Sequence, residues 1–223
     1  MALSVGCGVL TYNHVSTGRQ QDFETTWETI QDAGHPAEFL VLTNGSNDGT
    51  EDRVRELGGI VDDTRSEIWY GNQRLVDALV HNDMVVLSAD DLKYEPGWLA
   101  RMVAFMEAAP QVALASAYME PVWEWNTPRN TLDRGGERAV VRDSVCGSSW
   151  VFRSDDWKGW MGPFPRIFPG EDLVICRNRV NPTGRVCAAL DLVEHIGEER
   201  SAWGNQSHTY AVPLDREAWG LAA

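Results

Sequence analysis

Apolar runs of strand length alternate with helix-like patterns in the first half of the chain. The apolar runs lie at residues 4–10, 38–43, 60–61 and 84–89. The segments between them place apolar residues three or four positions apart, as on one face of a helix, and the clearest example is Phe23, Trp27 and Ile30. This alternation predicts an α/β fold whose central sheet is mostly parallel and flanked by helices.

The second half of the chain continues this alternation less regularly. We expect a helix after Pro96-Gly97-Trp98, another that opens at Gly170-Glu171-Asp172, and strands at 112–118, 145–152 and 185–193. Residues 120–143 show no periodicity, so we interpret them as a long loop that either faces a substrate or is solvated. Residues 197–210 are polar and irregular, which is typical of a lid or of a plain tail.

Composition narrows the classes of function. The 223 residues include 19 Lys and Arg against 33 Asp and Glu, which gives a formal net charge of −14 and argues against a broad nucleic-acid or anionic-membrane surface. No apolar run reaches the roughly 20 residues of a membrane span. The first residues lack the basic region of a signal peptide, and the four cysteines form no CxxC pair. We therefore expect reduced thiols and a cytoplasmic protein.

Polar side chains that could carry chemistry stand at element boundaries. Asp90 and Asp91 end the 84–89 strand, Glu171 and Asp172 open a helix, and His195 ends the last strand. In open α/β sheets, ligands bind beyond the carboxyl ends of the strands, and paired carboxylates there can hold a divalent cation against phosphate oxygens. A carboxylate at a helix start can act as a general base. Taken singly, a polar turn, a helix cap and a surface histidine explain these residues better.

Four stretches in this order resemble family-2 glycosyltransferases of the GT-A fold. The run Val9-Leu10-Thr11-Tyr12-Asn13 is similar to the family's first strand and nucleotide loop, and residues 43–50 (TNGSNDGT) are similar to its "DNGSxDGT" turn. Residues 87–92 (LSADDL), followed by 96–99 (PGWL), resemble its DxD segment and the helix after it. Residues 168–173 (FPGEDL) and 193–195 (VEH) resemble its "GED" helix and strand-end histidine. The resemblance covers nearly all of residues 4–200.

The resemblance implies one continuous, Rossmann-like GT-A domain with a small antiparallel portion on the acceptor side. Residues 1–95 would form the donor-binding half, and residues 96–223 the acceptor-binding half with a C-terminal lid or tail. The activity it implies is metal-dependent, inverting transfer of a hexosyl or N-acetylhexosaminyl group from a nucleotide-diphosphate sugar, most simply a UDP-sugar, to an acceptor hydroxyl. Mn²⁺ or Mg²⁺ would bridge the donor diphosphate.

The same resemblance assigns roles to individual residues. Asp91 and His195 would hold the metal, and Asp172 would be the catalytic base. Glu171 would orient the donor or the acceptor, and Asp90 would contact the ribose or the donor sugar. The remaining donor contacts that it implies are Thr11, Tyr12, Asn13, Thr43, Asn44, Asn72 and, in the irregular C-terminal segment, Trp203.

The sequence leaves several alternatives open. Ala89 occupies the first DxD position, and Thr43 stands where the family often has an Asp that holds uridine, so GDP or another nucleotide remains an alternative to UDP. A nucleotidyltransferase is disfavoured because residues 11–14 contain no GxG and no Lys, and a non-catalytic nucleotide-sugar or glycan binding module is the other alternative. A soluble acceptor is expected: a glycan, a protein, a small molecule or a modified DNA base. The arginines at 129, 134, 138 and 142 weakly favour an anionic one. A homodimer stays open.

Overall fold

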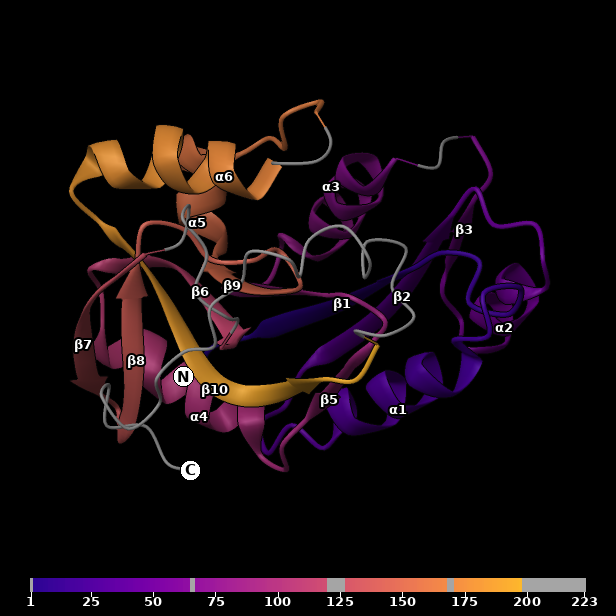
Figure 1. Cartoon of the computed structure of the whole chain (residues 1–223), viewed down its shortest axis with the longest axis horizontal. Coiled ribbons are helices and arrows are strands. Elements are labelled where there is room, and N and C mark those ends of the chain that lie inside the picture. The colour runs from indigo at the N-terminus through magenta and orange to yellow at the C-terminus, as the bar shows by residue number, and fades with distance from the viewer. Residues whose placement is uncertain (1, 65–66, 120–126, 168–170, 198–223) are drawn as a thin grey trace.

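A single large sheet organises the protein (Figure 1). The computed structural model describes residues 2–64, 67–119, 127–167 and 171–197. Within them the strand order is β3-β2-β1-β4-β9-β6-β10-β8-β7, and β5 pairs with β10 off this path. The strands are β1 (Val5–Thr11), β2 (Glu38–Asn44), β3 (Ile60–Asp62), β4 (Met84–Ser88), β5 (Leu92–Tyr94), β6 (Val112–Tyr118), β7 (Pro128–Arg134), β8 (Glu137–Arg142), β9 (Ser149–Arg153) and β10 (Val186–His195).

The sheet has a parallel part and a mixed part. Strands β3, β2, β1 and β4 run parallel to one another, as the alternation of strands and helices in the sequence predicts. Strand β9 then runs antiparallel between β4 and β6, while β6 and β10 are parallel to each other. Antiparallel pairing of β10 with β8 and of β8 with β7 completes the predicted antiparallel portion.

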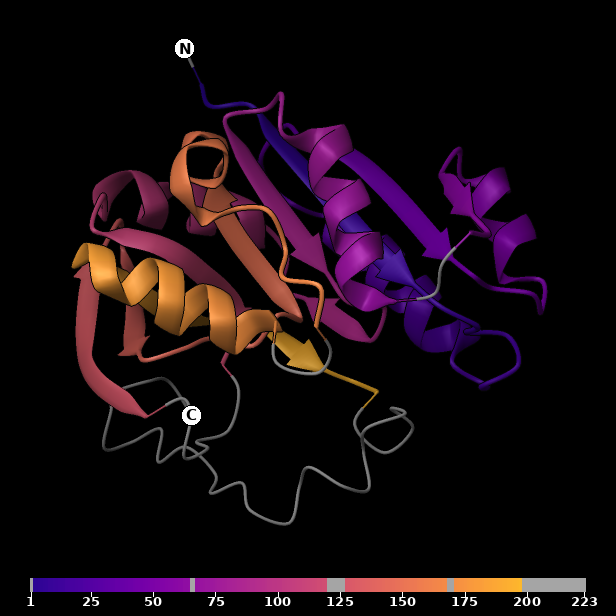
Figure 2. The same cartoon turned by 90° about the horizontal axis from the view of Figure 1, so that it is seen from above.

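Helices cover both faces of the sheet (Figures 1 and 2). One face packs against α1 (Gln20–Gln31), α2 (Thr50–Glu56) and α4 (Trp98–Ala108). The opposite face packs against α3 (Ile68–Leu79) and against α5 (Ser154–Asp156), α6 (Glu171–Ile175) and the short helices Trp157–Met161, Cys176–Val180 and Asn181–Thr183. The apolar side chains between these layers form two buried clusters, so the strands are covered on both sides as in other α/β sheets.

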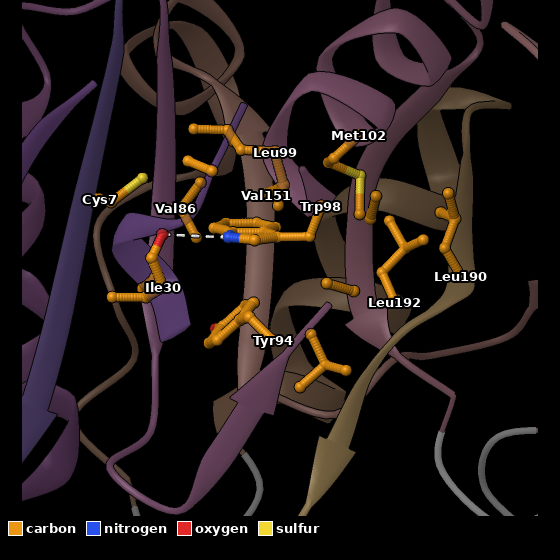
Figure 3. Packing of buried hydrophobic residues seen from close by; sticks show 14 of the residues in the cluster. Cys7, Ile30, Val86, Tyr94, Trp98, Leu99, Met102, Val151, Leu190 and Leu192 are labelled. Carbon is orange, nitrogen blue, oxygen red and sulfur yellow. Dashed lines mark hydrogen bonds between the residues drawn. The ribbon is translucent and has the colours of Figure 1, made fainter. Parts of the chain in front are cut away.

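Trp98 is the largest side chain in the buried cluster on the face that carries α1, α2 and α4 (Figure 3). It is completely buried, and its indole N–H donates to the carbonyl oxygen of Ile30 at 3.1 Å. Its ring lies 4.4 Å from that of Tyr94, measured between centroids. The indole thus joins α4, α1 and β5, and it holds β5 next to the acidic end of β4.

Three features of the chain differ from the sequence prediction. The described part of the 120–143 stretch is a β-hairpin, β7 and β8, and not an irregular loop. Gly135 and Gly136 at its tip have φ values of 59° and 86°, as a two-residue hairpin turn requires. Strand β7 is an edge strand with no fully buried residue, so it lacks the apolar alternation that reveals a strand. The short strand β5 was also missed, and β9 starts at Ser149 and not at 145.

We predict that Trp98→Ala lowers the free energy of unfolding by about 3–5 kcal/mol, because it leaves a large cavity at the junction of α1, α4 and β5. Trp98→Phe, which keeps most of the volume but leaves the Ile30 carbonyl without its donor, should cost about 1–2 kcal/mol. Urea denaturation of the three proteins measures both values. Equal stability of wild type and Trp98→Ala would contradict the packing described here.

Candidate functional site

The carboxyl ends of β1, β2 and β4 lie at one edge of the sheet. Thr11 pairs with Thr43 across β1 and β2, and Val9 pairs with Ser88 across β1 and β4. Because these strands are parallel, the residues that follow them leave the sheet together. Asp90 and Asp91 therefore lie close to the end of β1, as the sequence predicts.

Asp90 and Asp91 are both about 5% exposed, and Arg19 pairs with them. One Arg19 guanidinium nitrogen lies 3.1 Å from Asp90 Oδ1 and 3.6 Å from Asp91 Oδ2. Burial raises the pKa of Asp90 to about 6, although the Arg19 charge opposes this rise. The guanidinium therefore compensates two carboxylates that have lost most of their water.

Thr11 and His14 continue this network. The Thr11 hydroxyl donates to Asp90 Oδ2 at 2.6 Å, and it also lies 3.0 Å from His14 Nδ1. Since a hydroxyl has one hydrogen, His14 Nδ1–H must be the donor to Thr11. Burial lowers the pKa of His14, whose ring stacks on Phe23, so the imidazole is neutral at physiological pH. The arrangement fixes the orientation of Asp90.

A bend in β10 brings His195 to the acidic pair. The pairing of β10 with β6 is irregular between Ala189 and Val193, and beyond this point β10 pairs with β5. His195 consequently stands opposite Leu92, and its Nε2 lies 3.6 Å from Asp91 Oδ2. The backbone N–H of Ile196 donates to the Asp91 carbonyl at 2.9 Å. The structure thus brings Asp91 and His195 together as the sequence predicts.

The loops after β1 and β2 are joined by hydrogen bonds. The Asn13 N–H donates to Ser46 Oγ at 3.0 Å, and Asn13 Oδ1 accepts from the Asn47 N–H at 3.2 Å. Tyr12, which precedes Asn13, is 44% exposed, so its ring is accessible to a ligand. Thr11, Tyr12 and Asn13 therefore lie at one surface with the turn after β2.

The other donor candidates occupy different environments. Thr43 is fully buried, and its hydroxyl lies 2.5 Å from Ser46 Oγ. Asn44 is buried and donates to the Glu67 carbonyl at 3.0 Å, so Thr43 braces the turn after β2 and Asn44 joins the end of β2 to the start of α3. Asn72 is half-buried in the first half of α3. Its contact with a donor stays a prediction, and Trp203 lies outside the described residues.

Asp172 stands at the start of α6, near the end of β4. Its Cβ lies 4.0 Å from the position that a Cβ on Gly147 would occupy, and the carbonyl of the neighbouring Ser148 accepts from the Ala89 N–H at 2.7 Å. Burial raises the pKa of Asp172, although the Leu173 N–H donates to its Oδ1 at 2.8 Å and opposes the rise. Glu171 precedes it and is half-buried. A carboxylate with a raised pKa is a better proton acceptor than an exposed one.

A cavity of about 590 Å³ lies beside the end of β10. His195, Tyr118 and Lys93 are among its lining residues. Its other charged lining residues are the carboxylates Glu95, Asp191 and Glu194. This acidic lining suits a neutral polar molecule better than a diphosphate.

The four arginines of the hairpin differ in their surroundings. Arg129 pairs with Asp143, and Arg138 pairs with Asp133 at 2.7 Å. Arg142 is 1% exposed and lies 3.6 Å from the Met119 sulfur. Arg134 is exposed and donates to the Asp133 carbonyl at 2.7 Å, so an anionic acceptor stays a prediction.

Comparison with solved structures identifies the fold. A mannosyltransferase from Pyrobaculum calidifontis, in complex with GDP-Man and Mn²⁺, matches 86% of this chain at 17% identity with a TM-score of 0.63. GalNAc-T7, with UDP, GalNAc and Mn²⁺, matches 86% at 13% identity with a TM-score of 0.66. Glucosyl-3-phosphoglycerate synthase from Mycobacterium tuberculosis, with Mg²⁺ and UDP, matches 87% at 13% identity with a TM-score of 0.57.

The chain has a GT-A fold. It spans 55%, 44% and 72% of the lengths of these three proteins. No protein-family model and no curated protein matches the sequence. Among the described residues, no helix is both long enough and apolar enough to cross a membrane.

The residues at the end of β4 in this GT-A fold suit a divalent cation. Asp91 Oδ1 and His195 Nδ1 are buried and have no hydrogen-bond partner. An oxygen and a nitrogen donor are acceptable to Mn²⁺ and Mg²⁺. The described residues contain no group of three or more His, Cys, Asp or Glu arranged to hold a metal ion. An ion here would thus take its remaining ligands from water or from a bound ligand, as Mg²⁺ commonly does.

Sequence reasoning missed Arg19, which pairs with both carboxylates. One signal was available. Arg19 is the N-cap residue of α1, where a positive charge is opposed by the helix dipole. An arginine at a helix N-terminus suggests that an acidic side chain elsewhere in the fold pairs with it. The order of the strands in the sheet decides which acidic side chain that is.

We predict that Gly197→Ala weakens Mn²⁺ binding about 10- to 100-fold. A Cβ on Gly197 would lie 2.5 Å from Asp91 Cβ and 2.6 Å from Asp91 Oδ2, so the carboxylate must move. Gly159→Ala is the matched control, since a Cβ there meets no atom within 4 Å. Calorimetric titration of Mn²⁺ in the presence of UDP or GDP measures the effect, and equal affinity in both variants would contradict the role of Asp91.

Proposed function

We propose that this protein is a metal-dependent, inverting glycosyltransferase that moves a hexosyl or N-acetylhexosaminyl group from a nucleotide-diphosphate sugar to an acceptor hydroxyl. The observation that carries the proposal is the meeting of Asp91 and His195 at the end of β4 in a GT-A fold. It is supported by Asp172, whose raised pKa and position near the same strand end suit a general base. The solved structures with this fold are complexes with GDP-Man or UDP and Mn²⁺ or Mg²⁺.

The donor would lie over the ends of β1 and β2. Tyr12 and Asn13, together with Thr11, Thr43, Asn44 and Asn72, are proposed to contact the donor there, and Trp203 is proposed to contact it from the C-terminal segment. Residues 1–95 would form the donor half and residues 96–223 the acceptor half. A UDP-sugar is the first choice of donor, and the absence of an Asp at Thr43 keeps GDP-sugars as the second.

Each side chain has a part in the proposed reaction. A divalent cation held by Asp91 and His195 would offset the charge that develops on the leaving diphosphate. Asp172 would accept the proton of the acceptor hydroxyl while that oxygen bonds to the anomeric carbon and the carbon–phosphate oxygen bond breaks. Glu171 would orient the reacting sugar, and Asp90 would contact the ribose or donor sugar. Direct displacement of this kind inverts the anomeric carbon.

The acceptor is proposed to be a soluble, polar and uncharged molecule. The cavity beside His195 has a mostly acidic lining, and three of the four hairpin arginines, Arg129, Arg138 and Arg142, are paired or buried. A glycan hydroxyl fits these observations better than a phosphorylated acceptor. The second candidate function, a nucleotide-sugar or glycan binding module, has little use for a buried carboxylate at the start of α6.

We predict that Asp172→Asn lowers the rate of sugar transfer, or of donor hydrolysis, about 10²- to 10⁴-fold, because the amide cannot accept the proton. Nucleotide binding should be unchanged, since Asp172 is not placed at the diphosphate. The assay uses a panel of UDP- and GDP-sugars, with Asp155→Asn on the surface as the control. If the panel binds but wild type turns over no donor with any acceptor class, the binding-module function replaces the proposal.

We also predict that kcat/KM falls as the pH is lowered, and that the fall begins at a higher pH than for an exposed carboxyl group. The proposed base must be ionised, and burial raises the pKa of Asp172 above its usual 3.8, as it raises the pKa of Asp90 to about 6. The active, ionised forms are therefore lost at a higher pH than for exposed carboxyl groups. A rate that stays flat to pH 4.5, with circular dichroism showing folded protein, would contradict this assignment.

A further inference from the structure

Arg19 occupies the space between the two carboxylates where a divalent cation is proposed to bind. Its guanidinium lies 3.1 Å from Asp90 and 3.6 Å from Asp91, and it contacts the same Asp91 oxygen, Oδ2, that faces His195. The side chains of Arg19 and Asp91 are 14% and 7% exposed. A guanidinium is always charged, so it is a permanent rival for any cation that approaches this oxygen.

Within the described part of the chain, few other ligands are available to such a cation. Asp91 Oδ1 is buried without a partner, and the described residues hold no third ligand that completes a metal group with Asp91 and His195. An ion that enters without nucleotide must therefore share the Asp91 carboxylate with the Arg19 charge, which repels it, and fill its other positions with water. A bound diphosphate would supply the missing ligands, because its oxygens can bind the ion. The same oxygens are strong partners for the Arg19 guanidinium.

The position of Arg19 suits such an exchange. It precedes α1 at the end of the loop that carries Tyr12 and Asn13, and its second guanidinium nitrogen lies 3.4 Å from the Tyr12 carbonyl oxygen. The 12–19 loop borders the surface where the nucleotide is proposed to bind. Arg19 can thus reach an anion on that surface from the residues that contact the donor.

We propose that Arg19 makes metal binding depend on the nucleotide: it holds Asp91 until the donor diphosphate takes its guanidinium, and the divalent cation then binds Asp91. This inference rests on the proposed function, because it assumes a nucleotide diphosphate and a divalent cation at the end of β4. Arg19 would act on both the divalent cation and the nucleotide diphosphate. No covalent bond changes in this step.

The test is calorimetric titration of Mn²⁺, UDP and GDP, singly and together, on wild type and Arg19→Gln. With the competing charge removed, Arg19→Gln should bind Mn²⁺ alone about tenfold more tightly than wild type. It should bind the nucleotide alone about tenfold more weakly, because a charge-assisted contact is lost. These opposite changes separate the proposed exchange from a merely structural role, which would weaken both.

Two further variants complete the experiment. Arg138→Gln removes the same charge from the exposed β8 pair with Asp133 and should match wild type in every titration. Arg19→Lys keeps a positive charge but not the forked geometry, and its Mn²⁺ affinity should lie between those of wild type and Arg19→Gln. If Arg19→Gln fails to fold by circular dichroism, Arg19→Lys carries the comparison.

The outcomes distinguish this inference from the function on which it rests. If wild type binds nucleotide with Mn²⁺ but the Arg19 variants bind Mn²⁺ alone no more tightly than wild type, the exchange is wrong and the transferase proposal stands. If Arg19→Gln weakens both ligands, Arg19 only supports the site and the exchange is again wrong. If no protein binds Mn²⁺ or nucleotide in any combination, both proposals fail.

Discussion

Two adjacent carboxylates at the end of a buried strand impose the main constraint on this fold. Asp90 and Asp91 are almost completely buried, and a buried charge is costly unless it is paired and hydrogen-bonded. Arg19 and Thr11 supply these partners for Asp90, and His195 and Arg19 lie beside Asp91. The partners come from β1, from the start of α1 and from the end of β10. The acidic pair therefore ties the first and last described elements of the chain together.

The packing around the sheet positions these partners. Trp98 anchors α4 to α1 and lies against Tyr94 of β5, and β5 pairs with the bent end of β10. That pairing sets His195 opposite Leu92, next to Asp91. Gly197 then passes so close to Asp91 that no side chain fits between them. A tryptophan in the core and a bend in a strand thus determine the geometry of a polar site.

Much of this arrangement could be predicted from the sequence, and the exceptions have physical causes. The strands up to β4 were predicted because apolar periodicity is a local signal, whereas Asp91 and His195 were singled out by the resemblance to family-2 glycosyltransferases, and the structure places them side by side. The β7–β8 hairpin was not, since an exposed edge strand shows no apolar alternation. The pairing of Arg19 with Asp90 joins residues 71 positions apart, and only the parallel alignment of β1 and β4 brings them together. The pattern of apolar and polar residues within a short segment carries no information about such a long-range pair.

We propose that a divalent cation and a nucleotide diphosphate meet at Asp91 and His195. Anomalous diffraction from crystals grown with Mn²⁺ and UDP or GDP would locate both ligands. We expect one manganese peak in contact with the Asp91 carboxylate, the His195 ring and the nucleotide's phosphates. A nucleotide bound elsewhere, or a manganese ion that touches neither side chain, would contradict it.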